Sequence, residues 1–491
     1  MEMPLVQAIL DYVDEGTARF HVPGHKGMDL YSRLGFKLDW TYDLTEVRGT
    51  DNLQAPTGAI KRAQELAARA FGSDVCFFLV NGTTSGIHIM ILYAARPGDK
   101  VLLARSCHKS VWDALVLSGA VPVYIEPEYD EDRGLYTQVS LDSVKRAVKN
   151  NPDIVAMVIT SPNYYGMVGQ LEEICSYLRD RGILSLVDEA HGGHFIFNRK
   201  LPPSAADAGA DIWVQSAHKT LPSLTQASYL HARSDRVDTN VLASLHSMMM
   251  TTSPSYLLMA SLDLARAYME DRGQAELDRL IELVAASRQR LNRLGIDTMT
   301  SYARPELVAM DPTRLVLDLS SLSISGFEAE GLLRDRGIQV EMSDLTRLVC
   351  VSSLADKIED FDRLVAACDS LLRQGSNKDR PIFGQNLSLG SRLKKGARLD
   401  SGALIGPAAG IPDQVLSPRQ AFFSKKEYVP LARAQGRVCA GLVGSYPPGI
   451  PSFCPGDLID KAGLEYLSLV KDRGGQLFGL RDEDLVAVVK D

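Results

Sequence analysis

Short apolar runs alternate with amphipathic stretches between residues 75 and 231, and this alternation restricts the fold more than any other feature of the sequence. Runs such as 154–160 and 183–187 are almost entirely apolar, which is typical of strands buried on both faces. Regular alternation of this kind predicts an α/β domain with a mostly parallel sheet covered by helices. The expected strands are 75–80, 101–104, 121–125, 154–160, 183–187, 212–215 and 227–231. The expected helices between them are 83–95, 108–118, 141–149 and 171–181.

The chain changes character after this series. Helical periodicity at 256–269 and 275–294, with Gly295 as a stop, leads to a smaller α+β region with strands at 314–319 and 348–351 and helices at 327–336 and 358–372. Gly, Ser, Pro and Lys then interrupt every pattern, which predicts an irregular connector. The resulting domains are an arm at 1–30, a large domain at 31–255, a small α+β domain at 256–373, a connector at 374–420 and a C-terminal domain at 421–491.

Composition argues against several classes of partner. The chain has 491 residues and a net charge of -8, with 53 Lys and Arg against 61 Asp and Glu, and no segment is dominated by basic residues. Nucleic acid is therefore not an expected partner. No apolar run approaches the ~18 residues of a membrane helix, and the first residues lack a signal peptide pattern. Seven scattered cysteines without a Cys-x-x-Cys pair indicate reduced thiols, so we expect a cytoplasmic protein without a disulfide framework or zinc site.

Polar residues follow the first two strands of the series. Asn81-Gly82-Thr83-Thr84-Ser85-Gly86 leads into a helix, and free backbone N–H groups with hydroxyls at a helix N-terminus can hold a phosphate. The alternative is an ordinary helix cap. His108, in Ser106-Cys107-His108-Lys109-Ser110, follows the second strand, where a structural cap is again the alternative.

Two further strand ends carry ionisable residues. Asp188 ends a buried strand, where an unpaired carboxylate is costly and requires a cation, a metal or several donors. A metal held by Asp188, His191 and His194 is one alternative. Lys219, after Ser216-Ala217-His218, suggests a Schiff-base lysine with Asp188 as the partner of a pyridinium nitrogen, the alternative being a solvated loop lysine. A phosphate cradle, His, Asp and Lys at successive strand ends together fit pyridoxal 5'-phosphate (PLP).

Several longer motifs carry a resemblance to a known family. The chain resembles the Orn/Lys/Arg decarboxylases, bacterial basic amino-acid decarboxylases built on the aspartate-aminotransferase fold. The matching segments are Phe20–Gly27, Asp43–Glu46, Asn81–Thr84, Cys107–Ser110, Asp188–Gly192, Ser216–Thr220, Thr251–Tyr256, Ser417–Phe423 and Tyr446–Pro451. The Ser-x-His-Lys and Tyr-Pro-Pro-Gly-Ile-Pro runs are quite specific in combination. Three patches stay open between a structural role and a role in lining the site, namely His25-Lys26, Tyr446–Pro451 and Glu341.

The resemblance implies a PLP-dependent transferase fold and α-decarboxylation of a basic amino acid. Lys219 would bond to the cofactor, Asp188 would face the pyridine nitrogen, and His108 would stack on the cofactor ring. The other cofactor-binding residues that it implies are Thr83, Thr84, His191, Ser216 and His218, with Thr251 or Thr252 reaching the phosphate in a neighbouring subunit. No metal is expected.

Longer family members carry an N-terminal wing domain for which this chain has no room before its cofactor motifs, so we expect a homodimer or a dimer of dimers with shared active sites. The favoured reaction converts L-arginine to agmatine and CO2 for polyamine biosynthesis, with lysine second and ornithine third. Acids that could bind the cationic substrate tail are Glu46, Asp51, Glu341 and Asp344.

Two alternatives belong to other functional classes. One is an aminotransferase or an aldolase/lyase on the same fold, in which a small-domain arginine, with Arg347 as the candidate, holds the substrate carboxylate. The other is a PLP-binding regulator, which normally appends a DNA-binding helix-turn-helix; the sequence contains no basic recognition helix.

Overall fold

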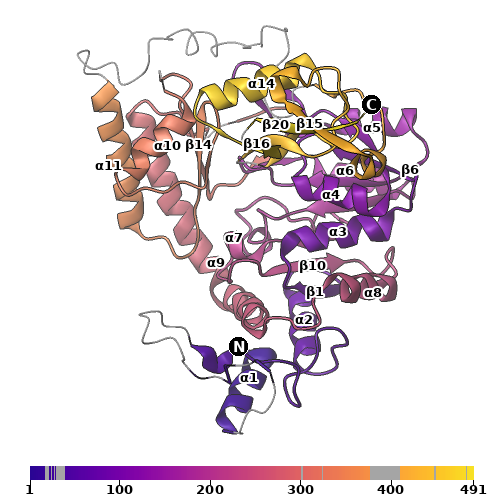
Figure 1. Cartoon of the computed structure of the whole chain (residues 1–491). Coiled ribbons are helices and arrows are strands. Elements are labelled where there is room, and N and C mark those ends of the chain that lie inside the picture. Colours follow the sequence, from indigo (N-terminus) through magenta and orange to yellow (C-terminus); the bar gives the residue numbers. More distant parts are fainter. Residues whose placement is uncertain are drawn as a thin grey trace. The chain divides into compact units, whose positions relative to one another are not determined.

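The computed structural model describes residues 1–16, 22–23, 25–26, 28, 39–299, 302–322, 324–375, 410–446, 449–482 and 484–490. These residues form two compact units (Figure 1). The first contains Met1–Tyr93 and Leu184–Asp278, and the second contains Ala94–Ile183 and Arg279–Asp491. Over the described residues, no helix is both long enough and apolar enough to cross a membrane.

The first unit holds four strands in the order β1-β10-β9-β8. Its strands are β1 (Val75–Leu79), β8 (Leu184–Asp188), β9 (Ile212–Gln215) and β10 (Ser228–Ala232). Its helices are α1 (Pro4–Asp14), α2 (Ala59–Ala70), α3 (Gly82–Ala94), α7 (Ala217–Thr220), α8 (Thr239–Met249) and the first part of α9 (Tyr256–Arg293), with 3-10 turns at Trp40–Tyr42 and Phe195–Phe197.

The second unit contains a parallel group of three strands in the order β6-β2-β3, together with smaller antiparallel sheets. In its first segment the elements are β2 (Lys100–Ala104), α4 (Lys109–Ser118), β3 (Val121–Ile125), β4 (Tyr129–Asp130), β5 (Leu135–Tyr136), α5 (Leu141–Asn150), β6 (Ile154–Thr160), β7 (Met167–Gly169) and α6 (Leu171–Arg179).

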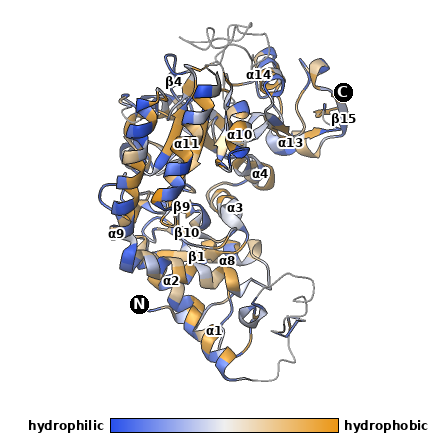
Figure 2. Ribbon diagram, turned by 90° about the vertical axis from the view of Figure 1, so that its left-hand side faces the viewer, coloured by the Kyte–Doolittle hydropathy of each residue, from blue (hydrophilic) through white to orange (hydrophobic). Residues whose placement is uncertain are grey.

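After α9 the second unit contains an antiparallel sheet in the order β12-β14-β13. The elements of this region are β11 (Leu307–Met310), β12 (Arg314–Asp318), α10 (Gly326–Arg334), β13 (Met342–Ser343), β14 (Arg347–Val351) and α11 (Ile358–Gly375). Helix α10 packs against β13 and β14, and α11 packs against α10. Figure 2 shows hydrophobic and hydrophilic residues on different sides of α11, in agreement with the buried Phe361, Leu364, Val365 and Cys368.

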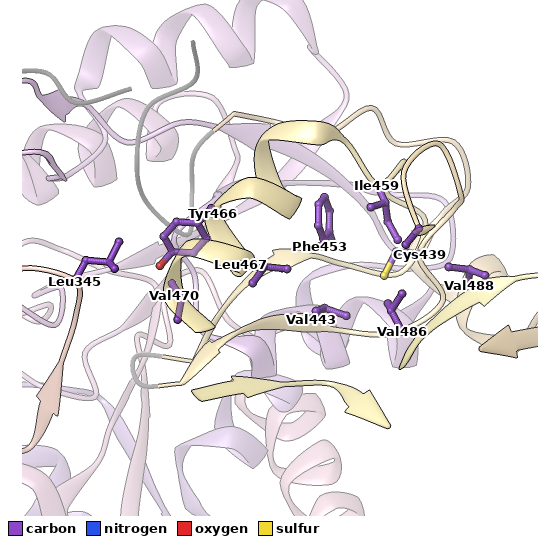
Figure 3. Packing of buried hydrophobic residues seen from close by; sticks show 11 residues of the cluster. Leu345, Cys439, Val443, Phe453, Ile459, Tyr466, Leu467, Val470, Val486 and Val488 are labelled. Carbon is purple, nitrogen blue, oxygen red and sulfur yellow. The ribbon is translucent and has the colours of Figure 1, made fainter. Parts of the chain in front are cut away.

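The C-terminal part of the second unit has a hydrophobic core of its own. Its elements are α13 (Pro418–Phe423), β15 (Lys426–Pro430), a 3-10 turn (Leu431–Arg433), β16 (Val443–Tyr446), β17 (Ile450–Phe453), α14 (Lys461–Asp472), β18 (Gln476–Phe478), β19 (Leu480–Arg481) and β20 (Leu485–Val489). Side chains from α14 and from β16, β17 and β20 gather in one cluster that includes Phe453, Leu467 and Val486 (Figure 3).

The α/β class predicted from the sequence is confirmed, and the strands at 121–125, 154–160 and 212–215 have the predicted bounds. Two details differ. Strand β10 runs antiparallel to both β1 and β9, because the segment between β9 and β10 contains only the four-residue α7 and no crossover helix. The expected connector at 374–420 lies largely outside the described residues, and its last residues begin α13.

Helices 256–269 and 275–294 were predicted as separate elements but form the single helix α9. Gly273 does not break it, because an interior glycine costs only about 1 kcal/mol and packing can repay that cost. A Cβ at Gly273 would lie 3.2 Å from the Cβ of Phe197, so the glycine allows close approach there.

Helix α3 lies unusually close to the sheet of the first unit at Gly86. A Cβ at this position would lie 2.6 Å from Cγ1 of Val214 on β9 and 2.7 Å from Cδ1 of Leu79 on β1. Both distances are far shorter than a van der Waals contact. The glycine therefore sets how near the N-terminus of α3 comes to the strand ends.

We predict that Gly86→Ala lowers the free energy of unfolding by about 1–3 kcal/mol, because the added methyl overpacks the contact between helix and sheet. Gly331→Ala in α10 is the matched control, since a Cβ at this helical glycine would have no atom within 4 Å and alanine is the better helix former. Urea denaturation measures both variants. Equal effects of the two substitutions would contradict the close packing at Gly86.

Candidate active site

A group of buried hydroxyls lies at the N-terminal end of α3. The Oγ1 atom of Thr83 forms a short hydrogen bond with Oγ of Ser216 and a 3.0 Å hydrogen bond with Oγ of Ser228. Thr84, the next residue of the first helical turn, is exposed. The first backbone N–H groups of a helix lack intrahelical acceptors. Thr83, Thr84 and Ser216 therefore surround a place that can accept an anion such as phosphate.

Asp188 is the last residue of β8 and is 3% exposed. Its Oδ1 accepts a hydrogen bond from the N–H of Ala190 at 3.1 Å, its single hydrogen bond among the described residues. Burial raises the pKa of the Asp188 carboxyl, and the nearby charge of Lys219 opposes that rise. The carboxylate keeps capacity to accept another hydrogen bond, and a cationic N–H donor would stabilise its charged form.

Lys219 lies in the short helix α7 and is half-buried. Its Nζ is 3.0 Å from Nε2 of the buried His191. An ammonium group can only donate, so Nε2 of His191 accepts. Ser216 is the N-cap residue of α7. Nδ1 of His218 donates to the carbonyl oxygen of Ala227 at 3.2 Å, which ties the residue before Lys219 to the segment after it.

The strand ends that carry Asp188 and Ser216 are joined by a buried network that the sequence analysis missed. Oε2 of Glu189 accepts a hydrogen bond from Nε2 of Gln215 at 2.6 Å, and Oε1 accepts one from the N–H of Ala205. Gln215 Oε1 lies 3.2 Å from Nε2 of His231. Burial raises the pKa of Glu189 to about 8 and lowers that of His231 to about 3. The sequence feature that could have revealed this network is the second acid, Glu189, directly after Asp188.

His108 belongs to the second unit, where it is the N-cap residue of α4. Its Nδ1 accepts a hydrogen bond from the N–H of Ser110 at 3.3 Å and lies 2.8 Å from the Ser110 hydroxyl. The neutral imidazole therefore carries its proton on Nε2. The helix cap considered as an alternative is therefore present.

Thr251 and Thr252 are exposed in the segment between α8 and α9 of the first unit. The carbonyl oxygen of Thr251 accepts a hydrogen bond from Nε2 of Gln54 at 2.8 Å, which anchors the segment. In the N-terminal region, Nε2 of His25 lies 3.1 Å from Oδ2 of Asp43. Within the described part of the chain, no three His, Cys, Asp or Glu side chains are grouped as a metal site would require.

The four acids considered for the substrate tail differ in what they already bind. Asp51 accepts hydrogen bonds from backbone N–H groups at the start of α2, including those of Gly58 and Ile60. Asp344 accepts from the Tyr165 hydroxyl at 2.6 Å. Glu341 is exposed. Glu46 has a buried Oε1 without a hydrogen-bond partner among the described residues, so it retains unused acceptor capacity.

Arg347 is committed to a buried ion-pair cluster. It is 2% exposed, and its guanidinium lies 3.3 Å from Asp318 and 3.8 Å from Asp344. It also donates to the carbonyl oxygen of Arg133. These partners account for its charge without a substrate carboxylate.

The residues of the first unit fit PLP. Asp188 is a buried acceptor that suits the protonated pyridine nitrogen, and Lys219 is the nearby amine. Thr83, Thr84, Ser216 and the N-terminus of α3 suit the phosphate.

Comparisons with known proteins agree with this fit. Residues 3–312 match the Orn/Lys/Arg decarboxylase major domain, and residues 408–484 match the C-terminal domain of the same family. A protein of Bacillus subtilis (strain 168) called arginine decarboxylase is 37% identical over 100% of this chain and 98% of its own length. An arginine decarboxylase of Bacillus anthracis is 36% identical over 99% of this chain and 96% of its own length.

Solved structures extend the likeness to the fold. The constitutive lysine decarboxylase of Escherichia coli superimposes with a TM-score of 0.83 at 22% identity, covering 100% of this chain and 82% of that chain. The Francisella novicida lysine decarboxylase LdcF gives a TM-score of 0.85 at 21% identity, covering 99% of this chain and 81% of that chain. Two domain matches and full-length relatives above 30% identity lead to one conclusion: this chain belongs to the Orn/Lys/Arg decarboxylase family.

Proposed function

We propose that this member of the Orn/Lys/Arg decarboxylase family uses PLP to convert L-arginine to agmatine and CO2. The observation that carries the proposal is the buried Asp188, whose carboxylate keeps acceptor capacity beside the charge of Lys219. The arginine assignment is supported by relatives from three Bacillus species and Halalkalibacterium halodurans that are called arginine decarboxylase, at 36–37% identity.

When bound, PLP supplies an electron-accepting ring that stabilises the charge left on the substrate Cα as CO2 departs. Asp188 would accept a hydrogen bond from the N–H of the pyridine nitrogen and so keep that nitrogen protonated. A protonated ring is the stronger acceptor of electrons. Thr83, Thr84, Ser216 and His218 hold the phosphate and so fix the orientation of the ring. Nζ of Lys219, held near Nε2 of His191, is positioned to return a proton to Cα.

The rival aminotransferase interpretation required a small-domain arginine to retain the substrate carboxylate, and Arg347 was its candidate. Arg347 is buried and paired with Asp318 and Asp344. Removing it from those partners would take its closest countercharge, at 3.3 Å, away from the buried Asp318, which is unfavourable. Its commitment favours decarboxylation over a reaction in which the carboxylate is kept.

We propose that the enzyme acts in the cytoplasm in polyamine biosynthesis. All seven cysteines are free thiols, which agrees with a reducing compartment. Among the four candidate acids, Glu46 is the first to test as the residue that binds the guanidinium tail, because its buried Oε1 lacks a partner among the described residues.

We expect Asp188→Asn to fold normally but to lower kcat by at least about 100-fold, since an amide cannot hold a protonated pyridine nitrogen by charge. Asp238→Asn is the matched control, because Asp238 is the exposed N-cap residue of α8 and asparagine caps a helix equally well. Turnover and the absorption spectrum of the bound cofactor measure the effect. Wild-type turnover in a well-folded Asp188→Asn protein would remove this residue from its proposed role.

The substrate is tested by CO2 release from the purified, PLP-loaded protein with arginine, lysine and ornithine at matched concentrations. We expect the highest kcat/KM with arginine, because a bidentate guanidinium contact gives more specific binding than an ammonium contact. Lys219→Ala should release no CO2 and should lose both visible cofactor absorption and reductive trapping by borohydride. A higher kcat/KM with lysine or ornithine would overturn the arginine assignment, and trapping in Lys219→Ala would overturn the role of the lysine.

We also propose a homodimer, or a dimer of dimers, in which Thr251 or Thr252 completes the phosphate site of the neighbouring subunit. The supporting observations are their exposure and an apolar hollow of the first unit, which is lined by residues of α1, of α9 and of the segment between α7 and β10, including the exposed Leu10, Leu264 and Leu224. Exposed apolar patches of this kind mark interaction surfaces.

Shared sites predict complementation between two inactive variants. Mixing Lys219→Ala with a Thr251→Ala/Thr252→Ala double variant should restore up to about a quarter of wild-type activity, because only a hybrid dimer contains one site with neither defect. Subunit exchange is verified by mass spectrometry of the mixture. Exchange without any rescue would show that each chain completes its own site.

A further inference from the structure

The Tyr-Pro-Pro-Gly-Ile-Pro motif has no role in the function proposed so far, yet its glycine contacts a candidate active-site residue. Gly449 lies between β16 and β17, and its carbonyl oxygen accepts a hydrogen bond from the N–H of Lys109 at 3.2 Å. A Cβ at Gly449 would lie 3.6 Å from Cδ2 and 3.7 Å from Nε2 of His108. Gly449 therefore lies beside the His108 imidazole, at a distance that leaves room for an ordinary van der Waals contact.

The backbone conformation at this position also requires glycine. Gly449 has a φ of +78°, in the left-handed region that side-chain-bearing residues rarely adopt. The edge of the ring on the Gly449 side includes Nε2, the nitrogen that carries the proton while Nδ1 accepts from Ser110. The ring is thus held at Nδ1 by its own helix and limited at the opposite edge by the turn.

A buried arginine three positions before His108 fixes the turn. Arg105 is fully buried, and its NH1 and NH2 groups donate to the carbonyl oxygens of Pro451 at 2.9 Å and Ser452 at 2.6 Å. The guanidinium also lies over the rings of Trp112 and Tyr124, at 5.1 and 5.7 Å from their centroids. One side chain therefore ties the segment that carries His108 to the strand that follows Gly449.

Asp457 completes this attachment. Its Oδ2 accepts a hydrogen bond from NH2 of Arg105 at 3.3 Å and another from the N–H of Cys454 at 2.8 Å. Burial raises the pKa of Asp457 to about 6, and the Arg105 charge acts in the opposite direction. The neighbouring Phe453 belongs to the core of the C-terminal part (Figure 3), so the carboxylate is anchored to a packed region.

We propose that the Gly449 turn is a positioning element for His108, and that the buried Arg105–Asp457 pair holds the turn in place. The inference rests on the proposed function in one respect, since His108 matters to catalysis only if it stacks on the cofactor ring. It gives the C-terminal domain a part in placing His108. Gly449, Arg105 and Asp457 are positioning residues, because they act through His108.

The central test compares two glycines of the C-terminal domain with the same backbone conformation. Gly449→Ala and Gly436→Ala both place a methyl at a φ of +78°, but a Cβ at Gly436 has nothing within 4 Å. Backbone strain is therefore matched, and the variants differ in the van der Waals contacts that the methyl at residue 449 makes with His108 and with Tyr446. We expect Gly449→Ala to lower kcat/KM with arginine at least about 10-fold more than Gly436→Ala and to alter the circular dichroism of bound PLP. Equal losses in the two variants would overturn the proposal.

A double-mutant cycle separates positioning from general damage. In a His108→Ala background the methyl at residue 449 has no ring to contact, so Gly449→Ala should lower kcat/KM by less than about 2-fold further. The circular dichroism of the cofactor should also be unchanged by the second substitution. A full additional loss in that background would show that Gly449 acts independently of His108 and would overturn the proposal.

A measurement on the cofactor-free protein keeps this inference apart from the proposed function. The rate at which diethyl pyrocarbonate modifies His108 is followed by mass spectrometry in wild type, Asp457→Asn and Gly436→Ala. We expect at least about a 3-fold faster rate in Asp457→Asn, because the neutral amide weakens the hold on Arg105 and loosens the turn, and no change in Gly436→Ala. An unchanged rate in folded Asp457→Asn would overturn the proposal. Absence of decarboxylation in wild type would instead overturn the proposed function alone.

Discussion

The burial of a carboxylate at the end of β8 is the physical constraint around which the first unit is organised. Asp188 is nearly inaccessible to water, and burial raises its pKa, so its charged form must be stabilised by positive charge. Lys219 supplies part of that charge, and a protonated cofactor nitrogen would supply the rest. The arrangement explains how an electron-accepting ring can be kept protonated at the pH of the cell.

The residues around Asp188 hold β8, β9 and α3 close to one another. Glu189 and Gln215 join the ends of β8 and β9, which carry Asp188 and Ser216, through a buried hydrogen bond of 2.6 Å. Gly86 lets α3 approach the same sheet closely enough for Thr83 to reach Ser216 and Ser228. The first contact uses polar groups that are hydrogen-bonded, because a buried polar atom without a partner would destabilise the site. The second uses a glycine, because a side chain would not fit.

The second unit applies the same principle to His108. Gly449, which has no side chain, lies beside one edge of the ring, and the helix N-cap holds the ring at Nδ1. The turn is itself held by a guanidinium that makes several directed hydrogen bonds inside a packed core. Arginine suits this task because its planar group offers five donors in fixed directions, whereas the three donors of a lysine ammonium rotate on a flexible stem.

Local patterns in the sequence were sufficient to predict the order of the elements, the α/β class and the family. Unbroken apolar runs predicted β3, β6 and β9 with the bounds that the structure shows, because strand burial leaves a direct mark on composition. Asp188 and Lys219 stood out because ionisable residues are rare at the ends of buried strands. These inferences required only neighbouring residues along the chain.

Contacts between distant residues decided the rest. The continuity of α9 through Gly273 and the pairing of Arg347 with Asp318 depend on packing partners outside the local sequence. The contact of Gly449 with His108, and the attachment of Arg105 to Asp457, join segments more than three hundred residues apart. The sequence by itself determined which residues could form strands, helices and a cofactor site. Only the tertiary structure decided which of them meet, because such pairings arise from long-range packing and hydrogen bonding that leave no periodic signal in the local sequence.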